Sequence, residues 1–261
     1  MTDVYDIHFE LSNEDRVSIL KTLVEESVNL TKLSNRLGLK NQETSRHLSR
    51  LENAGLVVKA PDGTFKTSLF GEICLSKDDE LSFLVDNREY FNTHKVNGIP
   101  SDLFAKIGVL ANSSFINDTL ISLQIAKRII EEAEEHLYRL SDQFMMMLLD
   151  PIVDAAERGV DYNLIYSASI HLPPDATETV RLRGARDKGN FHSYTHQDVK
   201  AYMVVSEKEA FLAFRNVNGK YDYMGFNSTD EGFLRWCREL YMTHHRNKMP
   251  PKPLWDGIPR T

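Results

Sequence analysis

The sequence contains little cysteine and no long hydrophobic run. Only two of its 261 residues are cysteine, and these, Cys74 and Cys237, lie far apart with no metal-type spacing. We expect two buried free thiols in a reducing compartment, with a single structural disulfide as the alternative. No stretch approaches the roughly 20 apolar residues of a membrane-spanning helix, and the acidic N-terminus lacks the basic-then-apolar order of a signal peptide. These absences predict a soluble, cytoplasmic protein with no membrane partner.

The sequence also lacks an overall positive charge, since its formal net charge is −7. The charge is unevenly distributed, because residues 31–68 carry seven Lys and Arg against three Asp and Glu, whereas residues 1–30 carry two against seven. Affinity for DNA follows the local electrostatic field rather than the total charge. The basic segment therefore predicts a phosphate-binding surface, and the alternative is a chance distribution of surface charge.

The first 68 residues predict three helices followed by a β-hairpin. Apolar residues recur at helical spacing in the first half of this segment, and a Pro-Asp-Gly turn separates two short strands in the second half. Thr31 lies where the second helix needs its N-terminal cap, and Gly38 lies where that helix ends. This is the order of a winged helix-turn-helix domain. The flanking helices are expected at 14–26 and 41–53, and the strands at 56–60 and 64–68.

The helix at 41–53 presents a polar face that suits the major groove of DNA. Asn41 and Gln42 can each form two hydrogen bonds with adenine, and Arg46 can do so with guanine, which discriminates by about 1–3 kcal/mol per base pair. Other polar and basic side chains nearby suit contacts with phosphate, although Glu43 and Glu52 weaken the positive field. Winged helices also act purely as protein-interaction modules, and this alternative stays open. The residues expected at the DNA are Thr31, Lys40, Asn41, Gln42, Ser45, Arg46, Arg50, Lys59 and Lys66.

The remainder of the chain predicts helices and then an α/β domain. A strand at 136–142, a helix at 143–159 and a strand at 160–169 give the pattern of a parallel strand–helix–strand unit. The alternative is one continuous coiled-coil helix from Ile116 through Leu140, but it spans fewer than four heptads. Further elements are expected near 174–183 (helix), 190–196 (strand), 199–226 (hairpin) and 229–247 (helix).

Four segments follow from these patterns. We expect a winged helix-turn-helix DNA-binding domain at 1–68, a helical linker that dimerises the chain at 69–135, an α/β effector domain at 136–248 and a flexible tail at 249–261. The expected fold class is an α+β N-terminal winged helix-turn-helix joined by helices to an α/β C-terminal sensor domain.

Several of these segments resemble one family of regulators. The run "ETSRHLSRLENAGLV" is similar to the DNA-reading half of archaeal and bacterial winged-helix regulators. The runs "AKRIIEEAEEHLYRLSDQ", "AAERGVDYNLIYS" and "GKYDYMGFNSTDEGFLRWCRELYMTHH" resemble archaeal regulators related to the methanogenesis regulatory proteins and the TrmB-like regulators. The resemblance spans roughly residues 10–248 and implies a transcriptional regulator. It also implies a C-terminal domain that binds an effector, either a small molecule or a protein. We expect this regulator to be a homodimer, because one recognition helix reads few bases and two half-sites increase both affinity and specificity.

That effector domain is similar in outline to the phospholipase D fold, whose enzymes use a His-x-Lys motif. The only His-Lys neighbours in this chain, His94 and Lys95, lack the intervening residue and are expected to lie in the linker. We therefore expect no enzymatic activity and no cofactor. His192 and His196 alternate along a strand and could face a metal together, but no third ligand has a matching spacing. No metal site is expected, and the residues that bind the effector are not identified by the sequence.

The resulting hypothesis is a sequence-specific DNA-binding transcriptional regulator that acts on double-stranded DNA as a homodimer. Its main alternative is a winged-helix module that binds the basal transcription machinery without reading DNA. An enzyme built on the C-terminal domain is the third hypothesis. It ranks last, because no Gly-rich phosphate loop or Ser/His/Asp arrangement is present.

Overall fold

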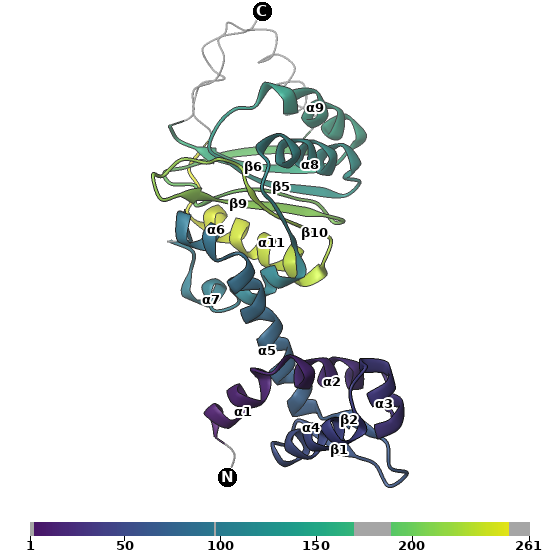
Figure 1. The fold of residues 1–261 in the computed structure, drawn as a ribbon. Coiled ribbons are helices and arrows are strands. Elements are labelled where there is room, and N and C mark those ends of the chain that lie inside the picture. The colour runs from purple at the N-terminus through teal and green to yellow at the C-terminus, as the bar shows by residue number, and fades with distance from the viewer. Residues whose placement is uncertain (1–2, 97, 170–188, 251–261) are drawn as a thin grey trace, which may run out of the picture. The chain divides into compact units, whose positions relative to one another are not determined.

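The computed structural model describes residues 3–96, 98–169 and 189–250 (Figure 1). The chain divides into two compact units, residues 1–83 and 84–261. Residues 69–83 pack with the first unit and residues 84–135 with the second, so the segment 69–135 forms no unit of its own. The expected helix at 174–183 and most of the expected tail lie outside the described residues.

The first unit is a helical domain with a two-stranded wing. It confirms the predicted order of three helices and a hairpin, and it adds a short helix in front that the sequence pattern did not predict. Its elements are α1 (Val4–Leu11), α2 (Glu14–Glu25), α3 (Leu30–Leu37), α4 (Asn41–Asn53), β1 (Val57–Lys59), β2 (Phe65–Thr67) and the first part of α5 (Leu69–Asp86).

The turn between α3 and α4 is set by the residues that flank α3. Gly38 ends α3 in the left-handed conformation, with φ 69°, which costs glycine little. The start differs from the prediction, because Asn29 and not Thr31 caps the helix. The Asn29 side chain accepts a 3.0 Å hydrogen bond from the Lys32 N–H. Thr31 therefore lies in the first turn of α3, where its side chain is exposed.

The core of the first unit holds α4 against its neighbours. Leu48 and Leu51 of α4 are buried with Leu33 of α3, and α5 adds Leu75. The close approach of α5 depends on Gly71, because a Cβ atom there would lie 2.2 Å from the backbone oxygen of Leu56. The short helices of this unit are thus held by tertiary packing rather than by intrinsic helix propensity.

The second unit is a mixed β-sheet with helices on both faces. Its strand order is β4-β10-β9-β8-β5-β6-β7, and β3 pairs with β9. The strands are β3 (His94–Lys95), β4 (Ser114–Ile116), β5 (His136–Ser141), β6 (Asp161–Ser167), β7 (Phe191–His196), β8 (Ala201–Val205), β9 (Ala210–Asn216) and β10 (Gly225–Ser228). The helical segments are α6 (Arg88–Thr93), α7 (Ser101–Phe104), η1 (Ile107–Asn112), α8 (Thr119–Glu132), η2 (Met146–Leu148), α9 (Leu149–Arg158) and α11 (Glu231–Arg246).

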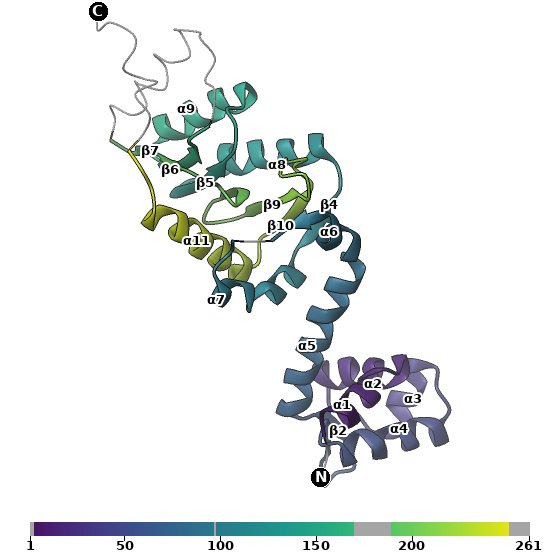
Figure 2. The ribbon, with the colours of Figure 1, turned by 90° about the vertical axis from the view of Figure 1, so that its left-hand side faces the viewer.

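Helices α8 and α9 cover one face of this sheet, and α11 covers the other (Figures 1 and 2). The pairs β5–β6 and β6–β7 are parallel, which confirms the strand–helix–strand unit and excludes the continuous coiled coil. The helix in that unit is shorter than predicted, since η2 occupies part of the segment before α9. The central strand β8 is buried at every position, as a sheet with helices on both faces requires.

The prediction for His94 was wrong about its surroundings. His94 belongs to β3, is buried, and places its Nε2 atom 3.0 Å from an Asp222 carboxylate oxygen. Its ring also stacks on Tyr90, with the ring centroids 3.8 Å apart. His94 is therefore a structural residue of the second unit and not part of an open linker.

Both cysteines are free thiols, as expected. Cys237 is buried and Cys74 is half-buried, and burial raises the pKa of both thiols. Among the described residues, no helix combines the length and the apolar character needed to cross a membrane.

His244 on α11 is a neutral imidazole locked between two backbone groups. It is 4% exposed, its Nδ1 atom lies 3.0 Å from the Leu240 carbonyl oxygen, and its Nε2 atom accepts a hydrogen bond from the Lys200 N–H. Burial lowers the pKa of His244 from 6.5 to about 4. The unfolded chain therefore takes up a proton at His244 at a higher pH than the folded protein does.

This pKa shift predicts that the second unit loses stability in mild acid. As the pH falls from 7 toward 4, the proton at His244 favours the unfolded state by about 2–3 kcal/mol. Unfolding in urea, followed by tryptophan fluorescence at several pH values, measures the effect, because Trp236 lies on the same helix. His244→Gln keeps an acceptor for the Lys200 N–H but cannot titrate, so its stability should depend less on pH by that amount. Parallel pH curves for the two proteins would contradict this assignment.

Candidate nucleic-acid interface

The outer face of α4 carries the polar residues that the sequence predicts to contact DNA. Asn41, Gln42, Ser45 and Arg46 are all exposed, whereas Thr44, Leu48 and Leu51 on the opposite face are buried. The helix packs against α2, α3 and β1. Because side chains recur every 3.6 residues, burying one face necessarily presents the other to solvent.

Two hollows on the surface of the first unit gather most of the predicted contacts. A groove of about 440 Å³ brings Thr31, Ser45 and Lys59 together from α3, α4 and β1, and Ser49 also lines it. A second hollow of about 380 Å³ contains Lys40, Gln42 and Arg46 beside Glu43. Residues from three elements thus form one polar surface that includes the start of α4.

Two predicted residues are placed differently. Arg50 makes an ion pair with Glu10, with Nη2 2.5 Å from Oε1, and this hydrogen bond raises the pKa of Arg50. Lys66 pairs in register with Val58, whereas Lys59 pairs with Phe65. Since side chains alternate along a strand, Lys66 projects from the face of the hairpin opposite to Lys59 and the buried Phe65. Lys59 faces the groove and Lys66 does not.

The charges of this surface are only partly neutralised inside the protein. Lys32 and Arg36 of α3 are paired with Glu25 and Glu26. In the described part of the chain, no acidic side chain lies within ion-pair distance of Lys40, Arg46 or Lys59. Lys59 contacts the Phe65 ring instead, with Nζ 5.5 Å from the ring centroid. These three cations remain available to phosphate.

The N-terminus of α4 adds unsatisfied backbone donors. Lys40 occupies the N-cap position, and its side chain makes no capping hydrogen bond. The first N–H groups of a helix have no partner within the helix, and together with the helix dipole they favour an anion. Lys40 itself is exposed at this end.

The buried carboxylate of Glu10, which the sequence did not reveal, helps to hold α4 in its orientation. Glu10 at the end of α1 is 7% exposed and contacts both Arg50 of α4 and Arg16 of α2, whose Nε atom lies 2.9 Å away. Arg16 also donates hydrogen bonds to the carbonyl oxygens of Phe9 and Glu10, and its burial lowers its pKa. The partners are as much as 40 residues apart, so no local spacing could have indicated this network.

The second unit contains a buried guanidinium without a carboxylate partner. Arg139 on β5 is 3% exposed, donates a hydrogen bond to the Ser141 hydroxyl, and lies 5.9 Å from the Tyr202 ring centroid. The Tyr162 and Tyr202 side chains also interact with its guanidinium. Within the described ranges, no Asp or Glu lies within ion-pair distance of it. Burial raises the pKa of the neighbouring Tyr162 and Tyr202, so both hydroxyls are neutral.

The two histidines considered for a metal have separate partners. His192 lies 3.3 Å from an Asp161 carboxylate oxygen, whereas the His196 ring packs against His244 with the centroids 5.0 Å apart. Among the described residues, neither belongs to a group of three side chains close enough to share a cation.

Comparison with known proteins places this geometry in a class. Residues 11–60 match the family model of a helix-turn-helix domain. With the wing formed by β1 and β2, the first unit is a winged helix-turn-helix domain. Residues 123–247 match the family model described as "Methanogenesis regulatory protein FilR1, middle domain". These matches confirm the resemblance seen in the sequence.

Solved structures with a similar course of the chain are more distant. The archaeal chromatin protein TrmBL2 is 16% identical over 93% of this chain and 95% of its own, with a TM-score of 0.44. The winged helix-turn-helix domain of Mb0332 from Mycobacterium bovis is 21% identical over 32% of this chain and 79% of its own, with a TM-score of 0.29. NucT from Helicobacter pylori is 16% identical over 53% of this chain and 97% of its own, with a TM-score of 0.41. No match was found among curated protein sequences.

Proposed function

We propose that this protein is a cytoplasmic transcriptional regulator whose winged helix-turn-helix domain binds double-stranded DNA through α4 and the wing. The observation that carries the proposal is the exposed face of Gln42, Ser45 and Arg46 beside the unpaired cations Lys40 and Lys59. In this arrangement α4 enters the major groove, and Thr31 and Lys59 contact phosphates on either side. Arg50 is occupied by Glu10 and has no part in the first contacts with DNA.

Docking on another protein is the alternative, and the charges favour DNA over it. A protein-binding face is expected to have an apolar centre, whereas the exposed face of α4 has polar and basic side chains. Glu52 in the groove opposes phosphate and limits the affinity. The matching regulator family supports the same assignment.

Two substitutions should separate base reading from phosphate binding. Arg46→Ala should relax the preference at one base position, because a guanine contact discriminates by about 1–3 kcal/mol. Lys59→Ala should weaken binding to all sequences alike and reduce the salt dependence by about one phosphate contact. Selection of bound fragments from randomised DNA measures the preference, and fluorescence anisotropy at several salt concentrations measures the affinity.

Lys21→Ala is the matched control, because Lys21 lies on α2 and pairs with Asp79. It should leave both measurements unchanged. Binding that survives the combined loss of Gln42 and Arg46 with its sequence preference intact would contradict the proposal. Absence of any salt-sensitive binding by the wild-type protein would do so as well.

The protein is further proposed to act as a homodimer joined through α5. Leu69, Ile73 and Leu81 lie on one side of this helix and are 74%, 54% and 54% exposed, and Phe70 lies among them. A row of exposed apolar residues on a helix favours association with a partner surface. Two copies would read two half-sites about 34 Å apart and so gain both affinity and specificity.

Negative charge introduced on the apolar side of α5 should separate the protomers. Ile73→Glu and Leu81→Glu together should convert the dimer into a monomer, and DNA affinity should fall by at least about tenfold. Sedimentation velocity measures the oligomeric state. Ser82→Glu introduces the same charge at an exposed position outside the apolar row and should leave the dimer intact. A wild-type protein that sediments as a monomer would overturn the proposal.

The second unit is proposed to bind a small anionic effector at Arg139. The support is the buried guanidinium, because a buried cation without an anionic partner is unfavourable and a carboxylate or phosphate ligand would neutralise it. No catalytic role is proposed for this unit, since His94 is held by Asp222 and Tyr90.

Thermal unfolding tests this site. Phosphorylated and carboxylated metabolites are added singly while the tryptophan fluorescence of the second unit is recorded, and a ligand at a hundred times its Kd should add about 2.7 kcal/mol of stability. Arg139→Met should abolish the response without unfolding the protein, because an apolar residue of similar volume can replace a buried charge. An unchanged response in Arg139→Met, or no response to any compound in the wild type, would contradict the assignment.

A further inference from the structure

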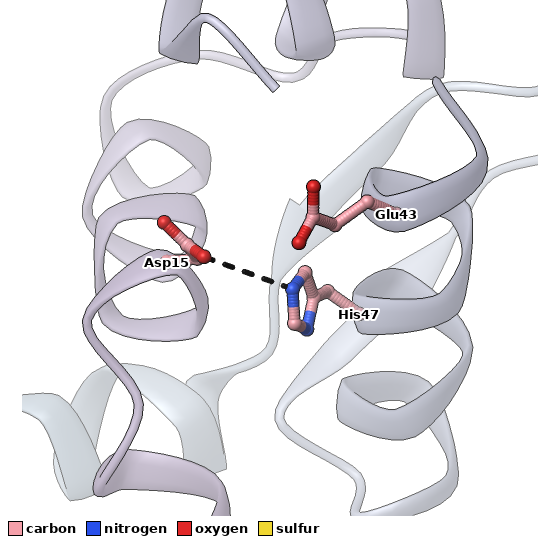
Figure 3. Close-up of side chains that lie close together, drawn as sticks. All are labelled: Asp15, Glu43 and His47. Carbon is pink, nitrogen blue, oxygen red and sulfur yellow. Dashed lines mark ion pairs between the residues drawn. The ribbon is translucent and has the colours of Figure 1, made fainter. Parts of the chain in front are cut away.

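Three side chains that could bind a metal meet between α2 and α4. Asp15 lies in the first turn of α2, and Glu43 and His47 lie one turn apart on α4, on the side that faces α2 (Figure 3). One ligand atom from each of the three lies within 4.8 Å of the other two. Figure 3 shows the Asp15 carboxylate and the His47 ring directed toward one another, with the Glu43 carboxylate above the ring.

His47 is the unusual member of this group. It is 5% exposed, and neither of its ring nitrogens has a hydrogen-bond partner. The nearest contact runs from Nε2 to Oδ2 of Asp15, at 3.9 Å, which is too long for a hydrogen bond. Buried polar groups are nearly always satisfied. An imidazole nitrogen directed at two carboxylates, without a hydrogen bond to either, is the arrangement that a bound cation would complete.

The carboxylates are also without a permanent cation. Among the described residues, no Lys or Arg side chain lies within ion-pair distance of Asp15 or Glu43. The nearby Arg16 guanidinium is held by Glu10 and by backbone carbonyls. Burial, followed by the field of Arg16, lowers the pKa of His47.

We propose that Asp15, Glu43 and His47 bind a divalent first-row transition cation such as Zn²⁺. One imidazole nitrogen and two carboxylate oxygens suit Zn²⁺ better than Mg²⁺ or Ca²⁺, which favour all-oxygen sites. Bonds of about 2.1 Å in a tetrahedral site place ligand atoms about 3.4 Å apart. On binding, the ligand atoms therefore approach one another by roughly an ångström, through rotation of the half-buried Asp15 and Glu43 side chains. Water completes the coordination on the open side.

The site has a consequence for the adjacent surface. Glu43 also lines the hollow that contains Lys40, Gln42 and Arg46. A bound cation would join the start of α2 to the first turns of α4 and would neutralise two negative charges close to that hollow. The cation should therefore strengthen DNA binding by reducing the repulsion of phosphate. This consequence rests on the proposed DNA-binding function, whereas cation binding itself does not.

Metal titration of the full-length protein tests the site. Protein stripped with a chelator is titrated with Zn²⁺ in a calorimeter, and with Co²⁺ while its visible absorption is recorded. We expect Asp15→Asn and Glu43→Gln each to weaken Zn²⁺ binding by at least about tenfold, as the loss of a ligand requires. Glu52→Gln changes an exposed acid on the same helix and is the matched control. It should bind Zn²⁺ as the wild type does.

His47→Gln removes the buried ligand and should abolish the Co²⁺ absorption, with circular dichroism to confirm that the protein is folded. If this variant does not fold, the two carboxylate variants still decide. Zn²⁺ binding that is equal in Asp15→Asn, Glu43→Gln and the wild type would overturn the proposal, because the ion would then occupy other residues. Absence of any Zn²⁺ or Co²⁺ binding would overturn it too.

Affinity for duplex DNA is measured separately, with and without Zn²⁺. A several-fold increase in the wild type that is absent in Glu43→Gln supports the link between cation and DNA. If the wild type binds Zn²⁺ at this site and no DNA under any condition, the proposed function fails and the metal site stands. If it binds DNA but no Zn²⁺, the proposed metal site fails and the proposed function stands.

Discussion

The candidate DNA-binding surface depends on the burial of one face of α4. Thr44, Leu48 and Leu51 are enclosed by α2, α3 and the wing, and this packing fixes the rotation of the helix about its own axis. With that rotation set, Gln42, Ser45 and Arg46 must point to solvent. A helix with the same polar residues but a weaker apolar face could roll, and its side chains would not hold one geometry toward a base edge.

Charged side chains lie against both halves of α4. Glu10 holds Arg50 and Arg16 beneath the C-terminal half of α4, which leaves Lys40, Arg46 and Lys59 as the cations of the outer surface. Near the N-terminal half, Asp15 and Glu43 place negative charge beside the buried His47. The acidic N-terminal segment, which at first argues against a nucleic-acid partner, thus supplies the groups that position the basic one.

Elements defined by local patterns were predictable from the sequence. The bounds of α4, the end of α3 at Gly38, the wing and the parallel β5–α9–β6 unit follow from periodicity and turn residues. Features that join distant segments were not predictable. β3 and β4 are three residues or fewer and exist only through pairing with β9 and β10, and α1 has too short a pattern to distinguish from a loop.

The same limit applies to the candidate sites. The polar face of α4 could be predicted because all its residues lie on one helix. The pairing of Arg50 with Glu10 and the meeting of Asp15 with Glu43 and His47 could not, because each combines helices whose packing the sequence does not show. Lys59 and Lys66 are both basic residues of the predicted wing, so the sequence alone does not distinguish their roles. Only the register of β1 and β2 shows that they project from opposite faces of the hairpin.

Site-specific photocrosslinking tests the orientation of α4 toward DNA most directly. A photoreactive amino acid placed at Gln42 on the outer face of α4, or at Ser76 on α5, is irradiated with a labelled pool of random duplexes at low salt. We expect crosslinks to DNA from position 42 that disappear at high salt, and few from position 76. Equal crosslinking from both positions, or crosslinking from position 76 alone, would contradict the account.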